Sequence, residues 1–114
     1  MMRADKSQLA GSAAMLIMKL LDGQDMYGYQ MIEELRRRSD QTFELKAGTL
    51  YPLLHGLEEK GYITSYQDDT DTARPHKYYH LTKTGREQLH EKQEEWRRYS
   101  RAVDLVMGGG VCFA

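Results

Sequence analysis

The chain has 114 residues, of which 40% are hydrophobic and 29% charged, a composition typical of one globular domain. Its 16 basic and 17 acidic residues leave a formal net charge of -1, so any DNA binding has to rest on the placement of a few cations. The longest apolar run, Ala13 to Met18, is far too short to cross a bilayer, and no secretory leader is recognisable. A single cysteine, Cys112, excludes an internal disulfide. These features predict a cytoplasmic protein without membrane contact.

Apolar residues at helical spacing predict two short helices in the first third of the chain. The first runs from Ser7 to Leu21, with Ser7 placed to cap it, and stops at the turn sequence DGQD. The second runs from about Tyr27 to Arg38 and ends in three consecutive arginines. One interpretation of those cations is that they complement the helix dipole; the other is contact with phosphate groups.

The segment KAGTLYPLLHGLEEKGYI, residues 46–63, predicts a third helix with both ends marked. Its apolar face follows the i, i+3, i+4, i+7 spacing of an amphipathic helix and consists of Leu50, Leu53, Leu54 and Leu57. Pro52 lacks a backbone donor, so it belongs in about the first turn, and the helix is expected to start between Ala47 and Leu50. Gly61 is expected to end the helix in the left-handed conformation.

Two strands and a long helix are predicted for the rest of the chain. The strands are Tyr62 to Tyr66 and Lys77 to Leu81, rich in aromatic and β-branched residues and joined by the protruding loop QDDTDTARPH. The helix runs from Thr82 to about Met107, with either Thr82 or Thr84 as its cap. A seam for a partner helix steps along it by 7, 3, 4 and 3 residues, through Leu89, Trp96, Tyr99, Val103 and Val106.

This order of elements predicts an α+β, mostly helical fold, in which a winged helix-turn-helix domain is followed by a long C-terminal helix. The winged domain is expected to span residues 1–81, with its first helix also in dimer contact. Residues 82–107 then form the dimerisation helix, and residues 108–114 a flexible tail. The third helix is the expected recognition helix, and the hairpin is its wing.

The polar face of the third helix is the first candidate site. Opposite the leucines it carries Lys46, Thr49, Tyr51, His55 and Glu59. Lys46 can neutralise a phosphate, Thr49 and Tyr51 can donate hydrogen bonds to phosphate oxygens, and His55 can reach a base edge. The alternative interpretation is an ordinary solvated helix face.

The hairpin loop is the second candidate site. Its return strand offers three basic side chains that we expect to approach the DNA backbone or minor groove: Arg74, His76 and Lys77. The tip is acidic and is expected to point away from phosphates; it carries Asp68, Asp69 and Asp71. In the alternative interpretation the loop is a solvated turn that contacts nothing.

Three segments, YGYQMIEEL, LKAGTLYPLLHGLEEKGYI and HKYYHLTKTG, resemble the PadR family of bacterial transcriptional regulators in its short form. The resemblance extends over roughly Leu9 to Val103. It implies a homodimer, joined through the first and last helices, that binds palindromic operator sites in double-stranded DNA. It also implies that small aromatic ligands relieve repression.

The resemblance assigns roles to five residues: Tyr29 near the DNA backbone, Thr49, Tyr51 and Pro52 at the start of the recognition helix, and Lys77 before the paired wing tyrosines. Two features depart from the family pattern. Gly56 stands where an arginine is common, and the wing has TARPH behind three aspartates in place of basic residues. Fewer phosphate contacts follow, so we expect modest affinity with a shallow salt dependence.

Trp96, the one tryptophan, lies midway along the long helix. The resemblance implies that Trp96 and its symmetry mate flank a cavity for a flat aromatic effector at the dimer centre. Met15, Met18 and Tyr99 are the expected walls, because methionine adapts to irregular ligands. The alternative is that Trp96 is a core aromatic at the helix seam.

Enzymatic and metal sites are not predicted. HEKQE at His90 lacks the second histidine of a zinc-protease motif, and Cys112 has no evident base to activate it. His76 and His80 share one face of a strand but lack further ligands at metal-binding spacing. The sequence therefore predicts a ligand-responsive repressor without cofactor or metal. A dimeric winged-helix protein-interaction module that does not bind DNA is the alternative, favoured by the near-neutral charge.

Overall fold

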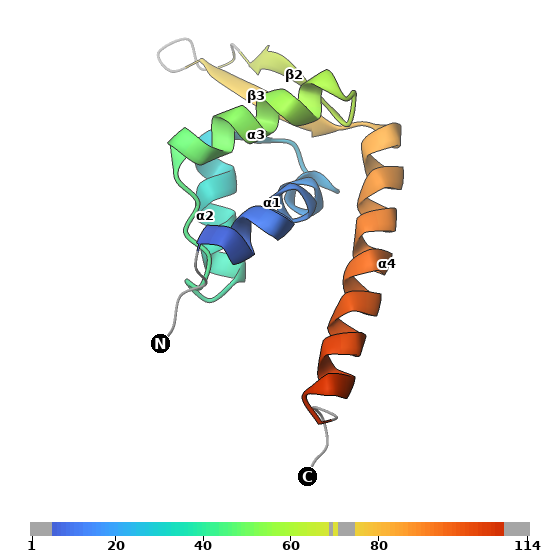
Figure 1. The fold of residues 1–114 in the computed structure, drawn as a ribbon. Helices are drawn as coiled ribbons and strands as arrows, with labels where there is room; N and C mark the ends of the chain where they lie inside the picture. Colours follow the sequence, from blue (N-terminus) through green and yellow to red (C-terminus); the bar gives the residue numbers. More distant parts are fainter. Residues whose placement is uncertain (1–5, 69, 71–74, 109–114) are drawn as a thin grey trace.

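The computed structural model describes residues 6–68, 70 and 75–108, with side chains from residue 12 onward. In chain order the elements are α1 (Lys6–Leu21), β1 (Met26–Tyr27), α2 (Gly28–Arg38), α3 (Ala47–Glu59), β2 (Ile63–Asp68), β3 (His76–Leu81) and α4 (Lys83–Val106). Figure 1 shows α1, α2 and α3 gathered beneath the hairpin of β2 and β3, with α4 running down one side. The predicted α+β, mostly helical, winged-helix arrangement is confirmed.

The three strands form one antiparallel sheet in the order β1-β3-β2. The two-residue strand β1 was not predicted, because two residues carry no periodicity; it places Met26 opposite Tyr79 and Tyr27 opposite Tyr78. Alternation along β3 buries Tyr79 and Leu81 on the side of the helices. The opposite face of β3 therefore carries His76, Tyr78 and His80.

The core is built where the apolar faces of the helices meet the inner face of the sheet. Leu50, Leu54 and Leu57 of α3 are buried, and Leu53 is half-buried against the same cluster, so the predicted apolar face is confirmed. Gly61 follows α3 with φ +78°, the left-handed end that was expected. Helix α3 begins at Ala47, within the expected range of starts, which makes Pro52 its sixth residue, in the second turn.

The start of α4 is tied closely to the corner that follows α3. Thr82 caps α4: its hydroxyl accepts from the Gly85 amide at 3.0 Å and points at the carbonyl oxygens of Gly61 and Tyr62, 2.7 and 3.0 Å away. The Thr82 amide also donates to the Tyr62 carbonyl. A side chain at Gly85 would place its Cβ 2.0 Å from that carbonyl oxygen, so only glycine fits.

Helix α4 leaves the core after its second turn. Leu89 is buried against the core, whereas the side chains from Trp96 onward are mostly exposed. The helix therefore projects past the other elements, as Figure 1 shows, and the Cα atoms extend over 56 × 32 × 22 Å. Within the described part of the chain, no helix combines the length and the apolarity needed to cross a membrane.

Candidate nucleic-acid interface

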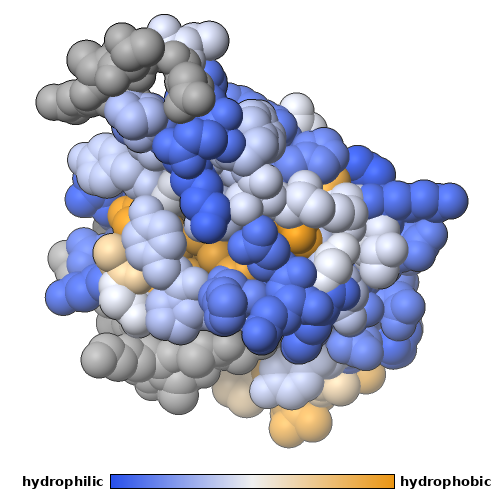
Figure 2. All heavy atoms as spheres, turned by 90° about the horizontal axis from the view of Figure 1, so that it is seen from above, coloured by the Kyte–Doolittle hydropathy of each residue, from blue (hydrophilic) through white to orange (hydrophobic). Residues whose placement is uncertain are grey.

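The outer face of α3 carries the polar residues expected there. Thr49, Tyr51, Pro52 and His55 are all exposed, as is Lys46, which occupies the N-cap position of the helix. The side chain of the N-cap residue Lys46 does not cap α3, but the Thr49 and Leu50 amides already donate to the Lys46 carbonyl oxygen, both at 2.9 Å. Figure 2 looks down on this part of the molecule and shows a mainly hydrophilic surface with small apolar areas between the polar side chains.

Tyr51 joins the start of α3 to the start of α2. Its ring is 48% exposed, yet its hydroxyl lies so close to Gly28 that a Cβ added there would be 2.2 Å from the oxygen. Tyr29 follows Gly28 directly and is 62% exposed. Two exposed tyrosines, Tyr29 and Tyr51, thus lie at the N-terminus of α2, which suits contact with phosphate groups.

Lys77 extends this region onto the wing. Its ammonium nitrogen lies 5.7 Å from the centre of the Tyr79 ring, on the face of β3 that points toward the helices. Burial raises the pKa of Tyr79, and the neighbouring Glu58 and Tyr51 of α3 raise it further, so the Tyr79 side chain faces α3. Lys77, Tyr79 and Tyr51 therefore connect the wing with the polar face of α3.

His76 does not share that surface, although the sequence groups it with Lys77. Its side chain lies on the opposite face of β3, where its ring stacks on Tyr27 with 3.9 Å between ring centres and 2° between the ring planes. Strand alternation separates His76 from Lys77, and this signal is present in the sequence. Arg74, Asp69 and Asp71 lie outside the described residues.

The three arginines that end α2 are paired with acids on the same helix. Arg36 bonds to Glu33 at 3.1 Å, and both Arg37 and Arg38 bond to Glu34 at 2.8 Å. Hydrogen bonds from Arg37 and Arg38 lower the pKa of Glu34 to about 2. These pairs favour the interpretation in which the cations serve the helix rather than a phosphate.

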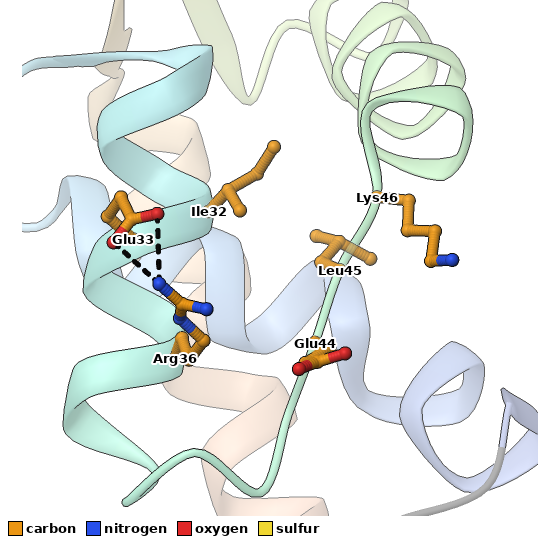
Figure 3. A pocket seen from close by; sticks show the side chains of 6 residues that line it. All are labelled: Ile32, Glu33, Arg36, Glu44, Leu45 and Lys46. Atoms are coloured by element: carbon orange, nitrogen blue, oxygen red, sulfur yellow. Dashed lines mark hydrogen bonds and ion pairs between the residues drawn. The ribbon is translucent and has the colours of Figure 1, made fainter.

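A shallow pocket of about 200 Å³ separates these pairs from the start of α3. Figure 3 shows Arg36 turned back toward Glu33 on one side of it, while Lys46 extends away on the other. Lys46 and Lys77 are therefore the cations that the described part of the structure places beside the polar face of α3.

An ionic cluster on the face of the wing opposite Lys77 was not predicted from the sequence. Asp25, just before β1, accepts a hydrogen bond from the Tyr66 hydroxyl at 2.7 Å, and its other oxygen lies 2.8 Å from His80 Nδ1. Burial raises the pKa of Asp25, but the bonds from His80 and Tyr66 outweigh it and hold the pKa below its usual value. The bond to Asp25 raises the pKa of Tyr66 to about 12. These partners are 41 and 55 residues from Asp25, so no local pattern reveals them.

The residues expected around an effector differ in their exposure. Met18 is completely buried in the core, so its assignment to a cavity wall is corrected. It lies on the face of α1 that packs on α2 and the sheet. Met15 is half-buried. Trp96 and Tyr99 are exposed on α4 with their ring centres 5.8 Å apart. Among the described residues, no group of three or more histidine, cysteine or acidic side chains is placed to hold a metal.

Known proteins share this arrangement. The chain is 33% identical over 79 residues to a transcriptional regulator of Mycobacterium tuberculosis, covering 69% of this chain and 70% of that protein. A transcriptional regulator from Clostridium thermocellum superposes with a TM-score of 0.81 at 29% identity, covering 89% of this chain and 95% of that one. A PadR family transcription regulator from Clostridium difficile gives a TM-score of 0.76 at 33% identity, covering 86% of this chain and 100% of that one.

The family model described as the transcriptional regulator PadR-like family matches residues 17–91. This match runs from α1 through the wing into α4 and includes the polar face of α3. The chain therefore belongs to the PadR-like family of transcriptional regulators, whose members regulate transcription and are not enzymes.

Proposed function

We propose that the protein is a homodimeric repressor that binds a palindromic operator through α3, the start of α2 and the wing. One observation carries this proposal: all four leucines of α3 turn inward, leaving Thr49, Tyr51 and His55 exposed, with Tyr51 beside the start of α2. In this mode α3 lies in the major groove, Tyr29 and Lys46 contact the backbone, and Lys77 contacts it from the wing.

The dimer is proposed to form through the exposed apolar seam of α4. Trp96, Tyr99, Val103 and Val106 repeat at helical spacing and are between 39% and 86% exposed in the subunit. A seam of this kind is covered by a second helix in a stable assembly. Two-fold symmetry then sets the two copies of α3 about one turn of DNA apart, roughly 34 Å.

An effector site is proposed at the same seam. Trp96 and Tyr99 offer two adjacent aromatic faces. Met15 of α1, which is only half-buried and has an adaptable side chain, is proposed as a wall of the effector site. Because Trp96 is the one tryptophan, its fluorescence reports directly on this region. Planar aromatic compounds should change that fluorescence and weaken operator binding; an unchanged signal across a broad panel would remove the effector from the proposal.

A mobility-shift titration tests DNA binding. The probe is the DNA upstream of the protein's own operon, at low and moderate salt, with a shuffled duplex for comparison. Tyr51→Ala should weaken binding about tenfold, the scale of a lost hydrogen bond to a charged group, while sedimentation still shows a dimer. Tyr51→Phe keeps the ring and isolates the contribution of the hydroxyl, and Gln24→Ala, at an exposed turn position, should bind normally.

Two results count against the proposal. Unchanged affinity in Tyr51→Ala means that α3 does not read DNA with this face. If the unaltered protein distinguishes no duplex from the shuffled one at either salt, DNA binding fails, and a winged-helix protein-interaction module becomes the better description. The pairing of all three arginines of α2 with acids of the same helix supports that second candidate.

A further inference from the structure

Tyr27 occupies a position that connects the wing to α2. Its backbone pairs with Tyr78 in the β1–β3 ladder, and it is also the N-cap residue of α2. The Tyr27 amide donates to the Gln30 side chain at 3.0 Å, which closes the first turn of the helix. The backbone of Tyr27 is thus held both by the sheet and by the helix.

The ring of Tyr27 reaches further along the wing than its backbone does. The ladder between β1 and β3 ends at Tyr78, whereas His76 and Lys77 pair with β2, opposite Asp68 and Gln67. A two-stranded hairpin without a third strand or a packed helix is only marginally stable, so its orientation needs further contacts. The Tyr27 ring stacks on His76 two residues beyond the ladder, and the edge of Tyr78 packs against it with ring centres 5.4 Å apart.

We propose that Tyr27 and His76 are positioning residues, whose stack sets the direction of the wing and so places Lys77 against DNA. The stack lies on one face of β3, and Lys77 projects from the other. Holding His76 therefore fixes the strand from which Lys77 extends, without occupying the DNA-facing side. This inference rests on the proposed DNA binding. It adds that Tyr27, at the start of α2, holds the wing in its DNA-binding position.

The competing role for His76 is direct contact with a phosphate as a cation. The two roles make opposite predictions for phenylalanine. His76→Phe keeps an aromatic ring for Tyr27 to stack on but removes the charge and the hydrogen-bonding nitrogens. His76→Ala removes both. Tyr27→Phe likewise keeps the stack, whereas Tyr27→Ala removes it.

Operator affinity of these variants, measured by fluorescence anisotropy at constant salt, decides between the roles. Tyr27→Ala and His76→Ala should each weaken binding about fivefold, the scale of one aromatic pair, and the double variant should be no weaker than either alone. Tyr27→Phe and His76→Phe should stay within about twofold of the unaltered protein. Thermal melting and sedimentation confirm that each variant is folded and assembled as the unaltered protein is.

A second readout follows Lys77 itself. Lys77→Ala should weaken binding and lower the salt slope by about one in the unaltered background. In the Tyr27→Ala background the same substitution should have a much smaller effect, because Lys77 is already misplaced. A purely structural role of the stack would leave the effect of Lys77→Ala equal in both backgrounds.

Three outcomes overturn the inference: normal affinity in Tyr27→Ala, equal losses in His76→Phe and His76→Ala, or full additivity with Lys77→Ala. Each leaves DNA binding by the unaltered protein intact, so it removes the positioning role alone. Absence of operator binding by the unaltered protein instead removes the proposed function, and this inference with it.

Discussion

Asp25 is a single carboxylate that ties both wing strands to the turn before β1. Tyr66 on β2 and His80 on β3 bond to its two oxygens, and the Asp25 side chain remains 31% exposed. A charge-assisted contact in such a partly shielded position contributes more than an ordinary surface ion pair. The cluster thus stabilises the wing from the face opposite Lys77.

Asp25→Asn should lower the free energy of unfolding by about 1 kcal/mol at pH 7. The folded-state pKa of Asp25 lies below its unfolded value, so the contribution is present above the unfolded pKa, about 3.9, and is lost as pH falls through the lower folded value. Urea unfolding gives the free energy of unfolding at pH 7 and at pH 3. That free energy should fall less in Asp25→Asn than in the unaltered protein when the pH is lowered from 7 to 3. Asp22→Asn removes a carboxylate with a similar exposure and one longer ion pair, 3.5 Å to Arg86; it is the matched control and should change little. An equal pH dependence in both proteins would contradict the role of Asp25.

Gly28 and Tyr51 provide a second test at the scale of residues. A methyl group at Gly28 overlaps the Tyr51 hydroxyl, which is the far end of a side chain that can swing away. Gly28→Ala should therefore fold normally but displace Tyr51 and weaken operator binding about tenfold, as Tyr51→Ala does. Adding Gly28→Ala to Tyr51→Ala should cost nothing further. Anisotropy titrations of the two single variants and the double variant measure this coupling.

Helices α3 and α4 each contain a glycine, but only the glycine in α4 lacks room for a side chain. Within the described part of the chain, nothing lies within 4 Å of a Cβ added at Gly56, in the middle of α3. At Gly85, in the first turn of α4, the added Cβ meets the backbone carbonyl of Tyr62. Backbone cannot rotate away as a side chain can, so the two helices should respond differently to the same substitution.

Gly56→Ala should raise the free energy of unfolding by about 0.5–1 kcal/mol, because alanine restricts the unfolded chain and suits a helix interior. Gly85→Ala should lower it by about 1–3 kcal/mol through overpacking at the α3–α4 corner. Thermal and urea unfolding of both variants compare them directly. A destabilised Gly56→Ala, or an unaffected Gly85→Ala, would contradict the packing described for these helices.

For the whole molecule, the exposed seam of α4 is the proposed contact between two subunits. Val103→Asp places a carboxylate, and its symmetry mate, in the proposed contact between two copies of α4. Burying unpaired charges should weaken the dimer by about 100-fold or more, and operator affinity should fall with it. Arg101→Glu, at an exposed position off the seam, is the control. Sedimentation over a range of concentrations measures the dissociation constant; a dimer unaffected by Val103→Asp would place the contact elsewhere.

The sequence predicted most of this fold because long amphipathic segments report their own buried faces. The leucines of α3 and the alternation of β3 are strong periodic signals. Strand β1 and the Asp25 cluster were not predicted, because the first is two residues long and the second joins residues far apart in the chain. Met18 was assigned wrongly because an apolar stripe does not show which of its members face the subunit's own core.

The locked corner between α3 and α4 has a mechanical consequence. Thr82 and Gly85 tie the start of α4 to the residues that follow α3, so we expect α3 and α4 to turn together. Helix α4 has 24 residues and is about 36 Å long. Rocking such an arm by about 5° shifts its end by about 3 Å, close to the rise of one base pair, about 3.4 Å. In the proposed dimer, a compound bound beside Trp96 would change the angle between the two copies of α4 and so move the paired α3 helices away from the spacing of the DNA half-sites.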